Sequence, residues 1–362
     1  MSDIFSVREA TTKSAEWLKS RGIPSPRLDA ELLLAEVLGV ERLALFMDPS
    51  RPLSEEERDA YRALIRRRGD HEPVAYILGN AGFWDIEVDV DKRALIPRPD
   101  TEKIIEEVLK AAGDRRDAPL RIVDVGCGSG ILGITLAKQF PQAQVVCIDV
   151  SQDALDLSAH NATKNGVRER LHFVRADLLE PLVLKGSRAD IIVSNPPYIG
   201  ESERDLMSRG VEEFEPTLAL FAGEDGFEII DRLLPQIPLT LAEGGLFVME
   251  FGSPQGEGIR ERARRRFRSW RVEKDWGGHD RVLVVDGPGE RVWADKSDPE
   301  STAEGAQSPA ETSPNDPLVD AQEPKEIAED FIPADAFHQN ARYGGADGTE
   351  LLPEIDLHAD ED

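Results

Sequence analysis

Cysteine is scarce in this sequence. Only two of the 362 residues are cysteines, Cys127 and Cys147. They form no CxxC pair and have no cluster of histidines near them, whereas a zinc site takes about four such ligands at close spacing. We therefore expect no bound metal, and two reduced, half-buried thiols.

Long apolar runs are also absent. No stretch of about 18 apolar residues occurs, so the sequence predicts no membrane span and no membrane partner. The first ten residues mix polar and charged side chains and lack the apolar stretch of a secretory signal. We expect a cytoplasmic protein and a monomer.

Basic residues are outnumbered by acidic ones, 43 to 70, which gives a net charge of −27. Residues 290–362 hold 20 acidic and 4 basic residues, a charge of −16, so the rest of the chain carries −11. The densest basic groups, residues 66–68 and 260–268, have the pattern of solvated helix faces. Because phosphate binding needs a concentrated basic stripe, we expect no direct contact with nucleic acid.

Residues 1–82 have a helical pattern and predict a small all-α domain. In residues 27–38, four apolar side chains recur at helical spacing and predict the buried face of a helix. These side chains are Leu28, Leu32, Ala35 and Leu38. Another helix should begin after Ser54, which can form a capping box with Glu57, and should run to about Arg68.

Residues 83–97 predict a β-hairpin linker. Residues that favour strands stand among acidic ones there, at Phe83, Ile86, Val88 and Val90. Pro97 and Pro99 then fix the backbone. Asp100 or Thr101 is expected to cap the helix that follows.

Between residues 98 and 286, predicted strands and helices alternate. The strands are expected at residues 121–125, 144–149, 171–175, 189–194, 245–251, 270–275 and 280–285. The helices are expected at residues 131–140, 152–165 and 227–234. This alternation predicts an α/β domain with a parallel sheet and helices on both faces. Residues 287–362 lose the apolar periodicity, and we expect them to be disordered.

A glycine-rich loop follows the first of these strands. It consists of Gly126, Cys127, Gly128, Ser129 and Gly130. The glycines let the backbone turn sharply and approach a ligand closely, which makes the loop a candidate cofactor site. Ile131 stands where a dinucleotide fingerprint has its third glycine, and no Lys-Ser or Lys-Thr pair follows, which excludes a P-loop. A turn that binds nothing is the alternative.

Two aspartates follow the next strands. Asp149 ends the second strand, where its carboxylate can accept hydrogen bonds from both ribose hydroxyls of a cofactor, or can cap the next helix. Asp177 follows the third strand and is placed to contact an adenine amine. Because ligands of such sheets bind at the carboxyl ends of the strands, we expect these loops to converge on one crevice.

The four residues after the fourth strand, Asn195-Pro196-Pro197-Tyr198, predict the chemistry of the site. The side-chain oxygen of Asn195 and the carbonyl of Pro196 can accept both hydrogens of a planar NH2 group. The two prolines stiffen the loop, and Tyr198 supplies an aromatic face for a planar amide or base. By itself this loop indicates only a planar nitrogen as the target.

Together these motifs resemble those of class I S-adenosylmethionine-dependent methyltransferases, and within them the HemK-type release factor glutamine methyltransferases. Further motifs of that family match Gly82-Phe83-Trp84, residues 96–102 (Ile-Pro-Arg-Pro-Asp-Thr-Glu), Phe214-Glu215-Pro216, Gly223-Glu224-Asp225-Gly226, Glu250 with Gly252 and Gln255, and Asp280-Arg281-Val282. The resemblance covers about residues 2–286. Leu178 stands where family members often carry an aromatic residue, which should weaken stacking on adenine.

The resemblance implies a fold, a cofactor and a substrate. The fold would be a Rossmann-like methyltransferase domain with a seven-stranded, mostly parallel sheet (98–286), preceded by a helical substrate-recognition domain and followed by an acidic tail. The cofactor would be S-adenosyl-L-methionine, held by Gly126, Cys127, Gly128, Ser129, Gly130, Asp149, Asp177, Leu178 and Asn195. The substrate would be the glutamine of a Gly-Gly-Gln loop in peptide-chain release factors, methylated at N5. Asn195 and Pro196 would hold it, Pro197 would stiffen the loop, and Tyr198 would pack on it.

Three alternatives remain open. A methyltransferase that modifies a ribosomal-protein glutamine would share these motifs. An amino-methyltransferase acting on adenine or cytosine in nucleic acid would share the Asn-Pro-Pro-Tyr loop, but usually adds a recognition domain and a basic channel. A non-catalytic module of the same fold would be indicated by an eroded glycine loop or a substituted Asn195, and both are intact.

Overall fold

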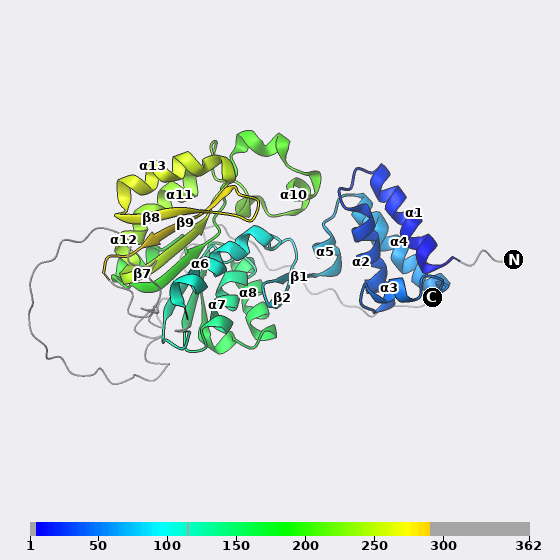
Figure 1. Ribbon diagram of the computed structural model, residues 1–362, viewed down its shortest axis with the longest axis horizontal. Coiled ribbons are helices and arrows are strands. Elements are labelled where there is room, and N and C mark those ends of the chain that lie inside the picture. Colours follow the sequence, from blue (N-terminus) through cyan, green and yellow to red (C-terminus); the bar gives the residue numbers. More distant parts are fainter. Residues whose placement is uncertain (1–4, 114–115, 290–362) are drawn as a thin grey trace, which may run out of the picture.

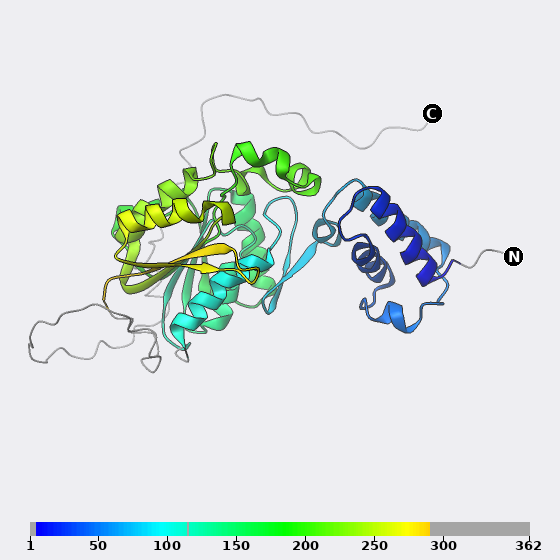
Figure 2. The same cartoon turned by 45° about the horizontal axis from the view of Figure 1, so that its top comes forward.

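The computed structural model describes residues 5–113 and 116–289, so the acidic tail from residue 290 onward lies outside the described residues. A helical unit and a larger α/β unit lie side by side, joined through a short hairpin (Figure 1 and Figure 2). The helices of the first unit are α1 (Val7–Ser20), α2 (Pro26–Leu38), α3 (Ala44–Met47), α4 (Glu55–Gly69) and α5 (Val74–Leu78). Among the helices of the described ranges, none is both long and apolar enough to cross a membrane.

Capping boxes begin two helices of the helical unit. At α4 the Ser54 hydroxyl accepts from the Glu57 N–H at 3.2 Å, and the Glu57 carboxylate accepts from the Ser54 N–H at 2.9 Å. The predicted cap is therefore confirmed, and α4 ends at Gly69, one residue beyond the predicted end. Ser6 and Glu9 form the same arrangement at α1.

The predicted helix is confirmed as α2, but the four residues that mark its helical spacing are not the face that enters the core. Leu28 is 44% exposed, and of the four predicted residues only Ala35 is buried. The residues that enter the core are Ala30, Leu33 and Leu34, which share one apolar cluster with residues of α1 and α4. Apolar side chains occupy most of the circumference of α2, so their spacing alone does not select a face.

The two basic groups are only in part the solvated helix faces that the sequence predicts. The Arg68 side chain is 11% exposed, and its Nε donates to Oδ2 of Asp29 at 2.7 Å. Asp29 is buried on α2, where an unpaired charge would be costly. In the second group, Arg260 and Arg262 of α13 (Gly256–Arg266) pair with carboxylates of other elements. Some of these arginines therefore join elements of the fold.

A two-stranded antiparallel hairpin, β1 (Asn80–Phe83) and β2 (Ile86–Asp89), connects the two units. It begins three residues before the predicted start at Phe83. A 3-10 turn (Pro99–Thr101) then leads into α6 (Glu102–Ala112). The predicted side-chain cap of this helix is wrong, because no side chain caps either element.

Seven strands form one mostly parallel sheet, as predicted. Their order is β5-β4-β3-β6-β7-β9-β8, and β9 runs antiparallel to both of its neighbours. The strands are β3 (Arg121–Val125), β4 (Gln144–Asp149), β5 (Leu171–Arg175), β6 (Ala189–Ser194), β7 (Leu241–Glu250), β8 (Ser269–Lys274) and β9 (Asp280–Asp286). The first four match the predicted bounds at both ends, whereas β7 begins four residues earlier than predicted.

Helices cover both faces of the sheet, because successive residues of a strand point to opposite sides. In β3, Ile122 packs with α6, α7 (Ile131–Gln139), α8 (Gln152–Lys164) and the hairpin. Val123 points the other way, into a cluster with residues of α9, α11, α12 and α13. The remaining helices are α9 (Glu180–Lys185), α10 (Arg209–Phe214), α11 (Glu228–Leu233) and α12 (Ile237–Thr240). Figure 1 places α10 on the side of the α/β unit that faces the helical unit.

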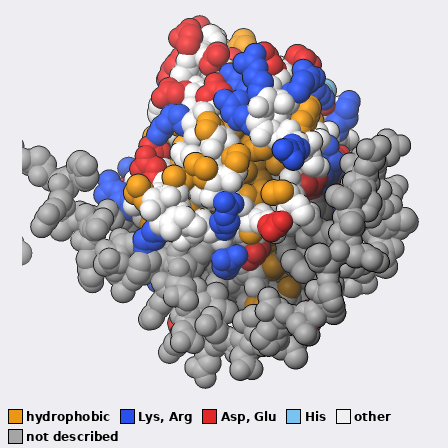
Figure 3. All heavy atoms as spheres, turned by 90° about the vertical axis from the view of Figure 1, so that its left-hand side faces the viewer, with side chains coloured by type: hydrophobic (Ala, Val, Ile, Leu, Met, Phe, Trp, Pro, Cys, Tyr) orange, Lys and Arg blue, Asp and Glu red, His pale blue; other side chains and the backbone are white. Residues whose placement is uncertain are grey.

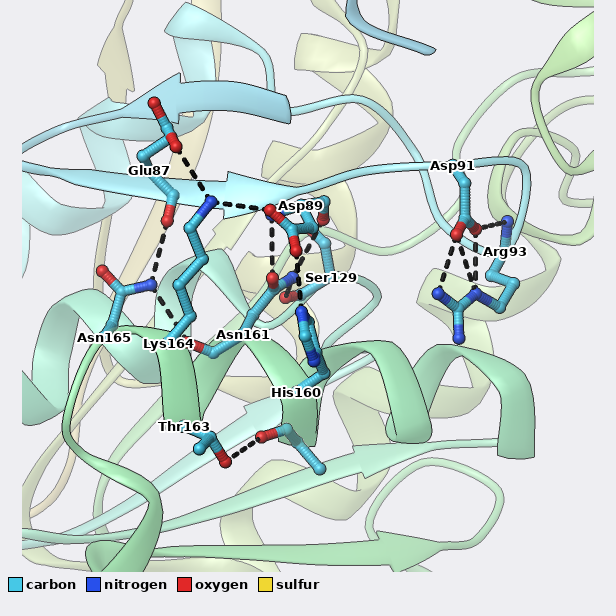
Figure 4. Close-up of polar contacts among 11 residues, drawn as sticks. Glu87, Asp89, Asp91, Arg93, Ser129, His160, Asn161, Thr163, Lys164 and Asn165 are labelled. Atoms are coloured by element: carbon cyan, nitrogen blue, oxygen red, sulfur yellow. Dashed lines mark hydrogen bonds and ion pairs between the residues drawn. The ribbon is translucent and has the colours of Figure 1, made fainter. Parts of the chain in front are cut away.

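Figure 4 shows how the hairpin is attached to α8. The buried Asn161 amide donates to the Asp89 carbonyl at 3.0 Å and accepts from the Asp89 N–H at 2.8 Å. It also donates to the carbonyl of Ser129, in the glycine loop, at 3.0 Å. Beside it, Lys164 pairs with Glu87 and Asp89. One side chain therefore ties together the hairpin, α8 and the glycine loop.

We predict that Asn161→Ala lowers the free energy of unfolding by about 2 to 4 kcal/mol, because backbone groups of Asp89 and Ser129 lose their partner. The control is Asn165→Ala, which removes two hydrogen bonds from a partly exposed side chain at the end of the same helix. It should cost less than about 1 kcal/mol. Urea unfolding measures both losses, and equal losses would contradict the expectation.

Candidate active site

Two adjoining cavities lie at the carboxyl ends of β3, β4 and β6. The walls of the larger cavity include the glycine loop, residues 93–98, Asp149, Asp177 and Leu178. The walls of the smaller cavity include Leu95, Met207, Val211, Leu220, Pro196 and Tyr198. Asn195 lines both cavities, as do Leu95, Arg98 and Ala219, so these residues lie at the boundary between the two cavities.

The glycine loop has the backbone geometry that requires glycine. The φ angle is 70° at Gly126, 54° at Gly128 and 86° at Gly130. A Cβ atom at Gly130 would also collide with the Ser158 hydroxyl on α8. The loop residues that line the larger cavity are Gly126, Cys127, Gly128 and Ser129. Gly130 is not among the lining residues, and its lack of a side chain serves the packing of α7 against α8.

Asp149 ends β4 with both carboxylate oxygens held in place. Oδ2 accepts from the Gly128 N–H at 3.0 Å, and Oδ1 accepts from the Ser151 N–H at 2.9 Å. Burial raises the pKa of Asp149, and these two hydrogen bonds lower it in part. Each oxygen keeps a further lone pair, so the carboxylate can still accept from hydroxyl groups of a ligand.

Asp177 and Leu178 form another part of the wall of the larger cavity. Asp177 is engaged in an ion pair with Arg232 of α11. Leu178 has a φ of 52°, an uncommon conformation for a bulky residue, so the backbone is strained at this point of the wall. The structure thus brings both predicted residues to the cavity, with Asp177 already in contact with a cation.

Asp124 is a site residue that the sequence did not predict. It is buried at the wall of the larger cavity, and its position in β3, two residues before Gly126, was the available signal. Oδ2 accepts from the Gly133 N–H at 2.8 Å, whereas Oδ1 has no hydrogen-bond partner among the described residues. Burial, together with the charge of Asp149, raises the pKa of Asp124 to about 7. Such an oxygen is suited to a cationic group of a ligand.

The side-chain amide of Asn195 is hydrogen-bonded to Thr101. Its Nδ2 donates to Oγ1 of Thr101 at 3.0 Å. Within residues 5–113 and 116–289, no hydrogen bond reaches Oδ1 of Asn195 or the carbonyl of Pro196. Both oxygens therefore remain available beside the cavities, as acceptance of a planar NH2 group requires.

Tyr198 is held through its hydroxyl, which donates to Oε1 of Glu250, the last residue of β7, at 3.1 Å. Burial and the charge of Glu250 raise the pKa of Tyr198, so the phenol stays protonated. Burial also raises the pKa of Glu250, while hydrogen bonding from Thr101 and Tyr198 and the charge of Arg281 lower it. The sequence did not predict a role for Thr101 or Glu250 in the site.

Residues of several motifs hold the backbone around this loop. Nε2 of Gln255 donates to the Tyr198 carbonyl at 3.0 Å and to the Gly226 carbonyl at 3.1 Å. A Cβ atom at Gly226 would collide with the same Tyr198 carbonyl, which accounts for a glycine there. Arg98, at the wall of both cavities, pairs with the buried Glu215. Motifs that are far apart in the sequence therefore meet around one loop.

Both cysteines are free and fully buried, rather than half-buried as predicted. Cys127 hydrogen-bonds with Cys147, and this contact together with burial raises the pKa of Cys127 well above its usual range. Burial follows from their positions, because one thiol lies at the start of the glycine loop and the other in β4, which is covered by strands on both sides. Within the described parts of the chain, no group of three or more His, Cys, Asp or Glu side chains could hold a metal ion.

Figure 3 shows the end of the α/β unit that lies opposite the helical unit. On this face the Lys and Arg side chains stand in separate groups, with acidic and apolar side chains between them. Such a mixture is unlike the continuous basic stripe that binds a phosphate backbone.

Comparison with known proteins identifies the family. Residues 9–79 match the PrmC N-terminal domain, and residues 103–214 match the methyltransferase small domain. The release factor glutamine methyltransferase of Chlorobaculum tepidum is 41% identical over 286 residues, which are 77% of this chain and 97% of that protein. The chain belongs to the release factor glutamine methyltransferase family.

Other members show the same extent of similarity. The release factor glutamine methyltransferase of Koribacter versatilis is 40% identical, covering 77% of this chain and 98% of the relative. The one from Bacillus subtilis is 37% identical, covering 71% and 90%. A solved protein-(glutamine-N5) methyltransferase from Alicyclobacillus acidocaldarius is 26% identical over 55% of this chain and 99% of its own, at a TM-score of 0.35, and the family assignment does not depend on it. The motif resemblance is thereby confirmed at the level of the family.

We predict that Asp124→Asn changes how stability depends on pH. The pKa of Asp124 is about 7 in the folded protein and about 4 in an unfolded chain. The folded state therefore holds the proton more tightly, and wild-type stability is lost as pH rises from about 4 to about 7. Between pH 5 and pH 8, the unfolding free energy of Asp124→Asn should rise by about 2 to 3 kcal/mol relative to wild type.

Urea unfolding of the ligand-free proteins at a series of pH values measures this difference. Asp156→Asn, on the exposed side of α8, is the matched control for the same change outside the cavity. Parallel pH curves for Asp124→Asn and wild type would show that the carboxyl of Asp124 is not perturbed.

Proposed function

We propose that this chain transfers the methyl group of S-adenosyl-L-methionine to the side-chain amide nitrogen, N5, of the glutamine in the Gly-Gly-Gln loop of a peptide-chain release factor. The observation that carries the proposal is the position of Asn195 between the two cavities, with its Oδ1 free to accept. The names of relatives that match over most of their length support this substrate. The proposed location is the cytoplasm, where release factors act.

The residues of the larger cavity fit S-adenosyl-L-methionine. Gly126 and Gly128 leave room for close approach to the backbone, and the fixed carboxylate of Asp149 offers acceptors for ribose hydroxyls. Asp177 and Leu178 would lie beside the adenine. Asp124 offers the free oxygen that the positively charged amino group of this cofactor would require.

The mechanism that follows depends on positioning. An amide nitrogen is a poor nucleophile, because its lone pair is delocalised into the carbonyl. By accepting its two hydrogens, Oδ1 of Asn195 and the carbonyl of Pro196 raise its electron density and direct the lone pair toward the methyl group. When bound, the cofactor would supply the methyl group on a positively charged sulfur and keep the electron pair of the broken S–C bond as a neutral sulfide. The amide nitrogen would release one of its two hydrogens to solvent as a proton. Among the described residues, no histidine or lysine lines either cavity, so these residues contribute orientation and hydrogen bonding rather than a strong base.

The smaller cavity favours a neutral amide over a nucleotide. Of the described residues that line this cavity, only Arg98 is charged, and it is already paired with Glu215. The other residues of the wall are mainly apolar and include Met207, Val211 and Leu220, in addition to residues of the Asn-Pro-Pro-Tyr loop. A phosphate-bearing substrate would find no free cation among these lining residues.

Methylation of a purified release factor with a tritium-labelled methyl donor tests the substrate. We expect label on the wild-type release factor and none on a variant with asparagine in place of the loop glutamine, because the shorter side chain cannot bring its amide to Asn195. A ribosomal extract and transfer RNA serve as competing substrates in parallel reactions. Label on either of these, with none on the release factor, would reject the proposed substrate.

A second prediction concerns the acceptor itself. Asn195→Ala should reduce the methylation rate by about 100-fold or more, because it removes a positioned hydrogen-bond acceptor. The affinity for S-adenosyl-L-methionine, measured by calorimetry, should stay within about twofold, since Asn195 is one of many residues that line the larger cavity and the other residues proposed to hold the cofactor remain. Asn165→Ala, the same change outside both cavities, should keep the wild-type rate. A fully active Asn195→Ala variant would contradict the mechanism.

A further inference from the structure

The orientation of the Asn195 amide decides whether the site can work. An asparagine side chain has an oxygen that accepts and an NH2 group that donates, and the two ends have nearly the same shape. With Oδ1 toward the cavities, Asn195 can accept a hydrogen from the substrate amide. With its NH2 group toward the cavities, Asn195 would direct its own N–H groups at the N–H groups of the substrate amide, and no hydrogen bond could form.

We infer that Thr101 fixes this orientation by accepting from Nδ2 of Asn195, and that Glu250 in turn fixes the hydroxyl of Thr101 as an acceptor. This inference rests on the proposed function, because it concerns the atom that receives the substrate hydrogen. Thr101 acts through Asn195 and is a positioning residue in this scheme.

The first step is the hydrogen bond of 3.0 Å from Nδ2 of Asn195 to Oγ1 of Thr101. A threonine hydroxyl can donate or accept, so this bond alone would not exclude the reversed amide. Thr101 is fully buried, so water does not compete for its hydroxyl. Its hydroxyl also forms no capping hydrogen bond with the first turn of α6, so it is available to accept from Asn195.

The second step is the carboxyl of Glu250, which is 1% exposed behind Thr101 and Tyr198. Oε1 accepts from the Tyr198 hydroxyl, and Oε2 is a buried acceptor with no hydrogen-bond partner among the described residues. Thr101 lowers the pKa of Glu250, which is the direction expected of a hydroxyl that donates toward a carboxylate. In its ionised form, the carboxyl of Glu250 can only accept. With Glu250 ionised, the hydrogen of Thr101 is directed to Glu250, and its lone pair is directed to Asn195.

Two variants separate the effect of the Thr101 hydroxyl from that of the side-chain shape. Thr101→Val keeps the branched shape and removes the hydroxyl, whereas Thr101→Ser keeps the hydroxyl and removes a methyl group. Thr135→Val is the matched control, because Thr135 is equally buried but its hydroxyl has no hydrogen-bond partner within the described parts of the chain. Since Thr101 also lines the larger cavity, kcat, KM for the release factor and the Kd of S-adenosyl-L-methionine are measured separately.

For Thr101→Val we expect kcat to fall about tenfold or more through misplacement of the acceptor, with the cofactor Kd within about twofold. Thr101→Ser should recover most of kcat, and Thr135→Val should match wild type. Wild-type kcat in Thr101→Val would overturn the inference. A serine variant as impaired as the valine variant would overturn it too, as would a loss found entirely in the cofactor Kd.

A readout without substrate separates this inference from the proposed function. In protein labelled with 15N at asparagine, the side-chain NH2 signals of Asn195 are identified by their loss in Asn195→Ala. Hydrogen exchange of this group should be faster in Thr101→Val, and unchanged exchange would overturn the inference even if wild type methylates no release factor. Should Thr101→Val not fold, Glu250→Gln serves the same measurements, with the same expected fall in kcat and faster exchange.

Discussion

The arrangement of the site depends on carboxyl groups buried behind the Asn-Pro-Pro-Tyr loop. Glu250 accepts the Tyr198 hydroxyl, and Glu215 pairs with Arg98 at the wall of both cavities. Two prolines restrict the loop, but they do not decide where Asn195 points. That is decided by Thr101, which holds the nitrogen end of the Asn195 amide. A substrate amide can then meet acceptors that are already in place, without reorganisation at the moment of reaction.

At the junction of the two units, a single buried side chain likewise holds several segments together. Asn161 joins the hairpin backbone at Asp89 to the Ser129 carbonyl in the glycine loop. A shift of the hairpin would therefore move the glycine loop in the wall of the larger cavity, because the Asn161 amide is hydrogen-bonded to both the hairpin and this loop. Buried polar side chains of this kind cost stability unless every bond is made, so they specify one arrangement.

Much of the fold and of the site could be predicted from local pattern. The strands β3, β4, β5 and β6 agree with their predicted bounds, because apolar runs between glycine and aspartate signals define buried parallel strands. The buried face of α2 could not be predicted, since apolar residues surround that helix and only its neighbours decide which side is covered. Likewise, the basic run around Arg68 predicted a solvated helix face, and nothing near it in the sequence indicated the ion pair with the distant Asp29.

For the site, the sequence by itself determined the residue types that chemistry requires: a glycine loop after β3, Asp149 and Asp177 at or just after the ends of β4 and β5, and the Asn-Pro-Pro-Tyr loop after β6. These are local properties of the backbone and of functional groups. Tertiary structure alone decided which of them meet. It brought Thr101 and Glu250 behind Asn195 and left Asp124 with an unpaired oxygen at the cavity wall. Burial and orientation arise from segments remote in the chain, and no local pattern encodes them.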